Sequence, residues 1–204
     1  MQRQARAEQS RRHVLDAALQ LFSTRGYRGT NVRDIADAAG VSTGNVYHHF
    51  ADKETVFRAL LEEFTVITES RRYPLTRVLT SGRFPEDLEQ VGFAARDSVR
   101  EFRQYIALIY VDVIEFDGTH IRKFYAEMAN RYTTRLREEG VLDGIRSRLR
   151  RGVSPVSAML LAARIYINYF SLEILFGVPE PFGKSAQQII TEIADILRNG
   201  LLES

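Results

Sequence analysis

The sequence contains no cysteine. Disulfides, thiolate metal sites and thiol redox sensing are therefore all excluded. Long uncharged apolar runs are also missing, because Arg164 and Glu173 interrupt the most apolar segment. No run reaches the roughly 18 residues that a membrane-spanning helix needs. The charged N-terminus, MQRQARAEQSRRH, is not followed by an apolar segment of the signal-peptide kind. We therefore expect a cytoplasmic protein with no membrane partner.

Sequence motifs of the common enzyme classes are absent as well. We find no Gly-x-Gly-x-x-Gly, no phosphate-binding loop, no Gly-x-Ser-x-Gly, no His-Glu-x-x-His and no cysteine nucleophile. We predict that the protein is not an enzyme and uses no cofactor and no metal.

Net charge is small but unevenly distributed. The 204 residues carry a formal charge of +2, and 45% of them are hydrophobic, which is enough for real cores. Residues 1–53 hold eight basic and five acidic side chains, whereas the remainder holds twenty and twenty-one. Three of the four histidines also lie in the first fifty residues. A basic head on a near-neutral body is typical of a protein that contacts DNA at one end.

Apolar residues recur at helical spacing along the whole chain, so we predict an all-α fold. A first helix is expected over residues 8–24, preceded by a disordered arm at residues 1–7. Another is expected from Asp52, as N-cap, to Glu69, and a loop or kink between Ser70 and Phe84. Ser154 and Pro155 are typical of a helix start, and that helix should run to about Phe176.

The segment from Gly29 to Lys53 has the pattern of two short helices joined at a tight turn. Thr30 is the expected N-cap of the first, and Gly40 closes it where a left-handed backbone is needed. Val41 should be buried in the turn, and Ser42 should cap the second helix. Val46 and Phe50, four residues apart, then hold that helix by one face.

The other face of this second helix carries small, polar or aromatic side chains and no carboxylate. A short helix that buries two residues and exposes uncharged hydrogen-bonding groups fits a DNA major groove. Together with the helix at residues 8–24 it should form a three-helix unit. The residues on the free face are Thr43, Gly44, Asn45, Tyr47, His48 and His49.

These residues resemble the N-terminal motif of the TetR family of bacterial transcription regulators. The resemblance is carried by Thr30, the run Arg33–Ala36, the run Ala39–Ser42, Val46–Tyr47, Phe50 and Lys53. It implies a three-helix helix-turn-helix DNA-binding domain at residues 1–52 and a larger helical effector-binding and dimerisation domain at residues 53–204.

The resemblance also implies a set of DNA contacts. Thr43, Gly44, Asn45 and His48 fall at base-facing or groove-facing positions, and Asn45 could pair with adenine. Arg33 falls at a base or phosphate contact. The helix-capping Ser42 is included in the predicted site. The phosphate-facing positions are Thr30, Tyr47, His49 and Lys53.

Aromatic residues of the larger domain are the expected lining of a small-molecule pocket, although each one taken singly is more often core. Arg164 and Asn168, inside an apolar helix, are either pocket groups or groups at a subunit interface. The predicted lining consists of Phe93, Phe102, Tyr105, Tyr110, Phe116, Phe124, Tyr125, Met128, Tyr166 and Tyr169.

Two polar clusters invite a metal interpretation. His48 and His49 are adjacent on a helix, so their side chains diverge by about 100° and cannot chelate one ion. A second cluster, Asp112, Glu115, Asp117 and His120, could hold a cation, but carboxylates of this kind are usually solvated or paired with arginines.

The sequence therefore predicts a sequence-specific DNA-binding transcriptional regulator, most simply a repressor that a small-molecule effector releases from its DNA operator. The resemblance implies a homodimer through residues 154–177 and 184–202. The alternative is an effector-free structural or chromosome-organising protein that uses the same helix-turn-helix. A third possibility is a helical enzyme or lipid carrier with an incidental DNA-binding head.

Overall fold

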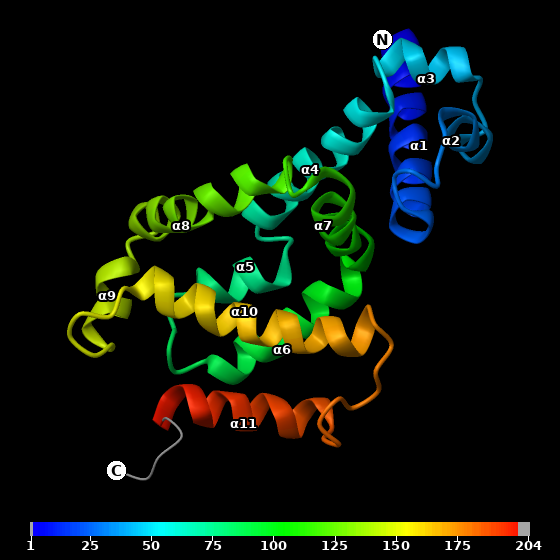
Figure 1. Cartoon of the computed structure of the whole chain (residues 1–204). Coiled ribbons are helices and arrows are strands. Elements are labelled where there is room, and N and C mark those ends of the chain that lie inside the picture. The colour runs from blue at the N-terminus through cyan, green and yellow to red at the C-terminus, as the bar shows by residue number, and fades with distance from the viewer. Residues whose placement is uncertain (1, 200–204) are drawn as a thin grey trace. The chain divides into compact units, whose positions relative to one another are not determined.

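Helices joined by turns and loops make up the part of the chain that the computed structural model describes, residues 2–199, with side chains from residue 4. Eleven helices and no strand occur in this range, which confirms the predicted fold class (Figure 1). None of these helices is long and apolar enough to cross a membrane. Contacts divide the chain into two compact units, residues up to 66 with 104–124, and residues 67–103 with 125 onwards.

The first unit is built on α1 (Gln2–Arg25), α2 (Val32–Ala39), α3 (Thr43–His49), most of α4 (Lys53–Glu69) and α7 (Arg103–Phe116). Helix α1 packs against both α2 and α3. The apolar stripe of α1 is buried, with Val14, Ala18 and Phe22 fully inaccessible to solvent. The prediction of a disordered arm was wrong for residues 2–7, which extend α1 by almost two turns; Met1 lies outside the described residues.

The second unit contains α5 (Pro74–Leu79), α6 (Leu88–Glu101), most of α8 (Ile121–Glu138), α9 (Leu142–Ser147), α10 (Pro155–Ile174) and α11 (Ala186–Asn199). Helix α6 is its centre and packs against α5, α10 and α11. The predicted cap of α10 is present, since Ser154 Oγ accepts a hydrogen bond of 3.4 Å from the Ser157 amide.

Two expectations for the second unit need correction. The stretch Ser70–Phe84 is not only loop, because α5 forms there with Pro74 in its first turn. Proline is favourable at that position, where its missing N–H would have had no helical partner. Helix α10 ends at Ile174, two residues before the predicted end. Of the expected dimerisation segment 184–202, residues 200–202 lie outside the described residues.

The expected domain boundary falls between α3 and α4. The contacts instead place most of α4 and residues 104–124 in the same unit as α1–α3. The division into a DNA-binding domain at 1–52 and an effector domain at 53–204 concerns function and stays a prediction.

Candidate nucleic-acid interface

Helix α2 begins with a reciprocal cap. Asn31 is the N-cap, and its side chain accepts from the Asp34 amide at 2.9 Å while the Asp34 carboxylate accepts from the Asn31 amide at 3.0 Å. The prediction of Thr30 as the cap was wrong by one residue. The Thr30 hydroxyl is buried and donates to the Gly26 carbonyl at 2.9 Å, so it stabilises the preceding turn.

The turn between α2 and α3 follows the sequence prediction closely. Gly40 has a φ of +67°, the left-handed conformation that glycine adopts most easily, and its amide together with that of Val41 bonds back to α2. Ser42 caps α3 by accepting from the Asn45 amide at 3.2 Å. Val41 is only half-buried rather than buried. The turn therefore fixes the direction in which α3 leaves α2.

Two buried side chains hold helix α3 in place, as predicted. Val46 is 1% exposed and Phe50 is 3% exposed. The guanidinium of Arg11 on α1 lies over the Phe50 ring, 5.2 Å from its centroid. Four of the other residues of the short helix are exposed, and Asn45 and His49 are half-buried.

The exposed surface of α3 carries predicted DNA-reading residues. Thr43, Gly44, Tyr47 and His48 are exposed, and Tyr47 keeps 56% of its surface accessible. The helix bears no acidic side chain. An exposed, uncharged, hydrogen-bonding face of this kind can approach a phosphate-lined groove without electrostatic repulsion.

Asn45 is half-buried and already engaged. Its Oδ1 accepts a hydrogen bond of 2.6 Å from the Ser10 hydroxyl on α1. This bond orients the side-chain amide before any DNA arrives and occupies one lone pair of its carbonyl oxygen. Ser10 was missed by the sequence analysis, because nothing in the α1 pattern distinguishes it from other polar positions.

His49 is half-buried next to α1. Its Nε2 is inaccessible and has no hydrogen-bond partner among the described residues. Burial lowers the pKa of His49 below 6.5, and the neighbouring His48 lowers it further. These surroundings therefore favour the neutral form of the imidazole over the protonated one.

Three other predicted DNA contacts sit in different settings. Arg33 and Ser42 are exposed, and the Arg33 guanidinium lies 4.0 Å from Asp37. The Lys53 ammonium instead donates to the main-chain carbonyls of Tyr27 and Thr30, at 2.8 and 2.7 Å. Burial lowers the pKa of Lys53, although Glu115 partly opposes this. Lys53 thus binds the turn between α1 and α2.

The acidic cluster near residue 115 is structural. Asp112 is fully buried and accepts from His120 Nδ1 at 2.6 Å and from the Ile121 amide at 3.0 Å. Glu115 accepts from the amides of Tyr27 and Arg28, and its Oε2 also lies 3.9 Å from Nε of the Arg28 guanidinium. The expectation of solvated or arginine-paired carboxylates was therefore wrong for Asp112 and is met by the arginine pair of Glu115. No group of three or more potential metal ligands occurs among the described residues.

The predicted pocket aromatics are divided between the two units. Tyr105, Tyr110, Phe116 and Phe124 belong to the first, where Tyr105 stacks on Phe64 with centroids 5.4 Å apart. The second unit holds Phe93, Phe102, Tyr125, Met128, Tyr166 and Tyr169.

Tyr166 and Arg164, on the same helix of the second unit, occupy contrasting positions. Tyr166 is fully buried and donates to the Ile190 carbonyl at 3.1 Å, as a core residue would. Arg164 is exposed and donates to the Tyr125 hydroxyl at 3.1 Å.

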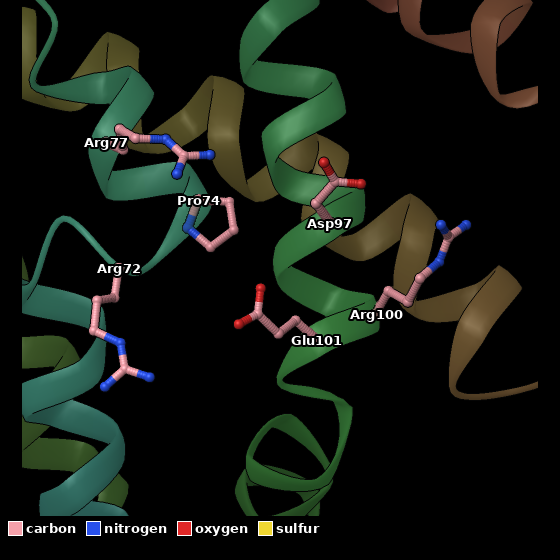
Figure 2. Close-up of a pocket in the computed structure, with 6 residues that line it drawn as sticks. All are labelled: Arg72, Pro74, Arg77, Asp97, Arg100 and Glu101. Carbon is pink, nitrogen blue, oxygen red and sulfur yellow. The ribbon is translucent and has the colours of Figure 1, made fainter.

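A surface recess of about 360 Å³ lies in the second unit, and none of the predicted aromatics belongs to its lining. Figure 2 shows charged side chains around Pro74, from α5 and the turn before it and from the C-terminal half of α6. The recess was not predicted from the sequence, because a loop or kink is the expectation for residues 70–84. Its lining consists of Arg72, Pro74, Arg77, Asp97, Arg100 and Glu101.

Comparison with known proteins decides the family. The sequence profile described as "Bacterial regulatory proteins, tetR family" matches residues 14–60. The HTH-type transcriptional repressor KstR2 of Mycobacterium tuberculosis is 32% identical over 154 residues, which cover 71% of this chain and 72% of that protein. The chain belongs to the TetR family of bacterial regulatory proteins. The protein of the same name from Rhodococcus jostii is 52% identical to this TetR-family chain over 54 residues, 26% of each chain.

Solved structures share the fold of this TetR-family protein. A TetR family transcription regulator from Marinobacter aquaeolei matches with a TM-score of 0.67 at 19% identity, over 94% of this chain and 97% of that one. A putative TetR-family regulator from Mesorhizobium loti matches with a TM-score of 0.64 at 21% identity, over 96% of both chains. In this TetR-family chain α2 and α3 form the helix-turn-helix, and the protein is a DNA-binding transcriptional regulator rather than an enzyme.

Proposed function

We propose that this TetR-family regulator is a repressor: it binds an operator as a homodimer, and a small molecule bound by its second unit releases it. The relatives from M. tuberculosis and R. jostii are named transcriptional repressors, which supports the direction of regulation. Such a protein would act in the bacterial cytoplasm, where the operator is.

The exposed, acid-free face of α3 carries this proposal. We propose that Thr43, Gly44, Asn45 and His48 approach base edges. Tyr47, Arg33, Ser42 and His49 would contact or approach the phosphates. Thr30 and Lys53 would contribute indirectly, because their polar groups are bonded to the turn that precedes α2.

The homodimer is supported by apolar side chains left exposed on the last two helices. Leu161 and Ile165 on α10 are 64% and 43% exposed, and Ile196 on α11 is 38% exposed. Phe176, just after α10, is 56% exposed. A symmetric pair that buried these residues would present two copies of α3, and an operator with half-sites about 34–36 Å apart would fit them.

Effector release would follow from coupled equilibria. A ligand that prefers a conformation in which the two α3 helices are wrongly spaced must weaken operator binding by the same factor that the operator weakens ligand binding. The half-buried Phe93, Phe102, Tyr125 and Met128 are the candidate lining in the second unit. Unchanged operator affinity across a broad ligand screen would refute this part of the proposal.

The central test introduces a negative charge on the exposed face of α3. The wild-type protein would first enrich its operator from a random duplex library. Thr43→Glu should then reduce affinity for that duplex by at least about tenfold, a cost of ~1.4 kcal/mol, because it places a carboxylate against phosphate-lined DNA. Thr134→Glu, at an exposed position on α8, is the matched control and should have little effect. Equal binding by both variants would disprove the assignment of α3.

A further inference from the structure

Glu115 on α7 accepts hydrogen bonds from two main-chain amides of the turn between α1 and α2. One carboxylate oxygen, Oε1, accepts from the Tyr27 amide at 2.8 Å, and the other, Oε2, accepts from the Arg28 amide at 2.7 Å. Its side chain is only 13% exposed. Hydrogen bonds to an ionised carboxylate are shorter and stronger than neutral ones, and two parallel bonds also fix direction. Glu115 therefore holds two successive peptide groups in one orientation.

The turn is shaped to receive this carboxylate. Helix α1 ends at Arg25, and Gly26 adopts a φ of +76°. Successive main-chain N–H groups next to a left-handed residue form a concavity that binds anions. A Cβ atom at Gly26 would lie 2.7 Å from Glu115 Oε1. Glycine at position 26 thus serves both the backbone conformation and the close approach of the carboxylate.

A cation holds the same turn through its carbonyl groups. Lys53, the first residue of α4, donates to the carbonyls of Tyr27 and Thr30 at 2.8 and 2.7 Å. Its ammonium also lies 3.9 Å from the centroid of the Tyr27 ring. The N–H groups of the turn are bound by an anion from α7 and its carbonyls by a cation from α4, so the turn is fixed from two elements distant in sequence.

This turn leads directly into the reading helices. Thr30 is followed by Asn31, the N-cap of α2, and α2 packs against α3. The Tyr27 ring packs against Phe116, next to Glu115 on α7, with centroids 4.6 Å apart. Any displacement of the turn must therefore change where α2 starts and how α3 is presented.

We propose that Glu115 is a positioning residue for DNA reading, which sets the orientation of the helix-turn-helix by clamping the α1–α2 turn to α7. The inference rests on the proposed DNA-reading role of α3. The proposal predicts the direction in which DNA affinity changes when the Glu115 charge is removed. Removing a negative charge from a DNA-binding unit should by electrostatics alone strengthen binding, whereas loss of a positioning carboxylate should weaken it.

Glu115→Gln is the informative variant, because the amide keeps the size of the side chain but presents an NH₂ group where one oxygen accepted. We expect operator affinity to fall about tenfold, the effect of losing a charged hydrogen bond. Hydrogen exchange of the Tyr27 and Arg28 amides, followed by NMR, should accelerate. Glu62→Gln, an exposed position on α4 in the same unit, is the charge-matched control and should bind as tightly as wild type or slightly more tightly.

Glu115→Asp provides a rescue test, since it keeps the charge but is one methylene shorter. It should recover part of the affinity and protect at most one of the two amides; it also decides the matter if Glu115→Gln does not fold. Two outcomes would overturn the inference. In one, either variant loses protection of the Tyr27 and Arg28 amides but keeps full operator affinity. In the other, either variant loses operator affinity while the protection of these amides is unchanged. If the wild-type protein binds no enriched duplex, the proposed function fails instead, while the amide exchange still reports the clamp.

Discussion

The imidazole of His49 lies in surroundings that lower its pKa. Its Nε2 is enclosed without a partner among the described residues, and both burial and His48 lower its pKa. The residue belongs to the reading helix, yet its side chain is half-buried in its own unit. Its protonation state therefore bears on folding as well as on any phosphate contact.

A pH dependence of stability follows. Because the folded pKa of His49 lies below the value of 6.5 that the unfolded chain retains, the unfolded state binds the proton more readily. The contribution is fully present above pH 6.5 and is lost as the pH falls through that value towards the folded pKa. We expect the melting temperature to decrease between pH 7 and pH 5, and His49→Gln to remove part of that decrease. His13→Gln, at an exposed position on α1, is the control. An identical pH profile for wild type and His49→Gln would contradict the prediction.

Single-residue roles on α3 were only partly predictable from sequence. The capping serine and the two buried anchors follow from local spacing, so Ser42, Val46 and Phe50 could be assigned. The state of Asn45 could not, because its carbonyl partner, Ser10, is 35 residues away in sequence. Free pairing of this amide with adenine was inferred without knowledge of that bond.

At the scale of elements, helices with a clear apolar stripe and a capping residue were predicted well. The start of α10 follows from Ser154 and Pro155, and the turn between α2 and α3 from Gly40 and Ser42. The α1–α2 turn was not predictable in its detail, because Glu115 binds it from 88 residues away. Helix α5 could not be predicted, because proline and glycine near it favour a loop or kink.

The packing of α6 depends on one small residue. A Cβ atom at Gly92 would lie 2.8 Å from Ile190 Cγ2 and 2.9 Å from Tyr166 Cε1. Gly92→Ala should therefore destabilise the protein by about 1–3 kcal/mol through overpacking against α10 and α11. Urea denaturation followed by circular dichroism measures the change.

Gly144→Ala is the matched control for this substitution. The added methyl group on α9 meets no atom within 4 Å, so the usual helical preference for alanine should stabilise the protein by up to about 1 kcal/mol. If Gly92→Ala were as stable as Gly144→Ala, α6 would not be packed against Ile190 and Tyr166 as described.

At the scale of the whole molecule, family and general function were accessible from the first sixty residues, whereas the effector was not. The reading motif is local in sequence, so its caps and spacing are visible in one stretch. A ligand site depends on side chains brought together from several helices, and the predicted aromatics fall into both units. Tyr166, for example, is an aromatic residue of the kind that lines pockets, but it is buried in the core of the second unit.

The proposed dimerisation would link the second unit to operator recognition. Leu161→Asp would place a carboxylate in the apolar surface of α10 and α11 proposed to pair with a second copy, where burial of an unpaired charge is costly. We expect sedimentation velocity to show a monomer at concentrations where wild type is a dimer. Operator affinity should fall at least about tenfold, because a monomer loses the second half-site. Ile114→Asp, at a position on α7 that is 77% exposed and outside this surface, is the control and should remain dimeric. A Leu161→Asp protein that stayed dimeric and bound the operator normally would show that the two copies meet elsewhere, even though α3 would still read each half-site.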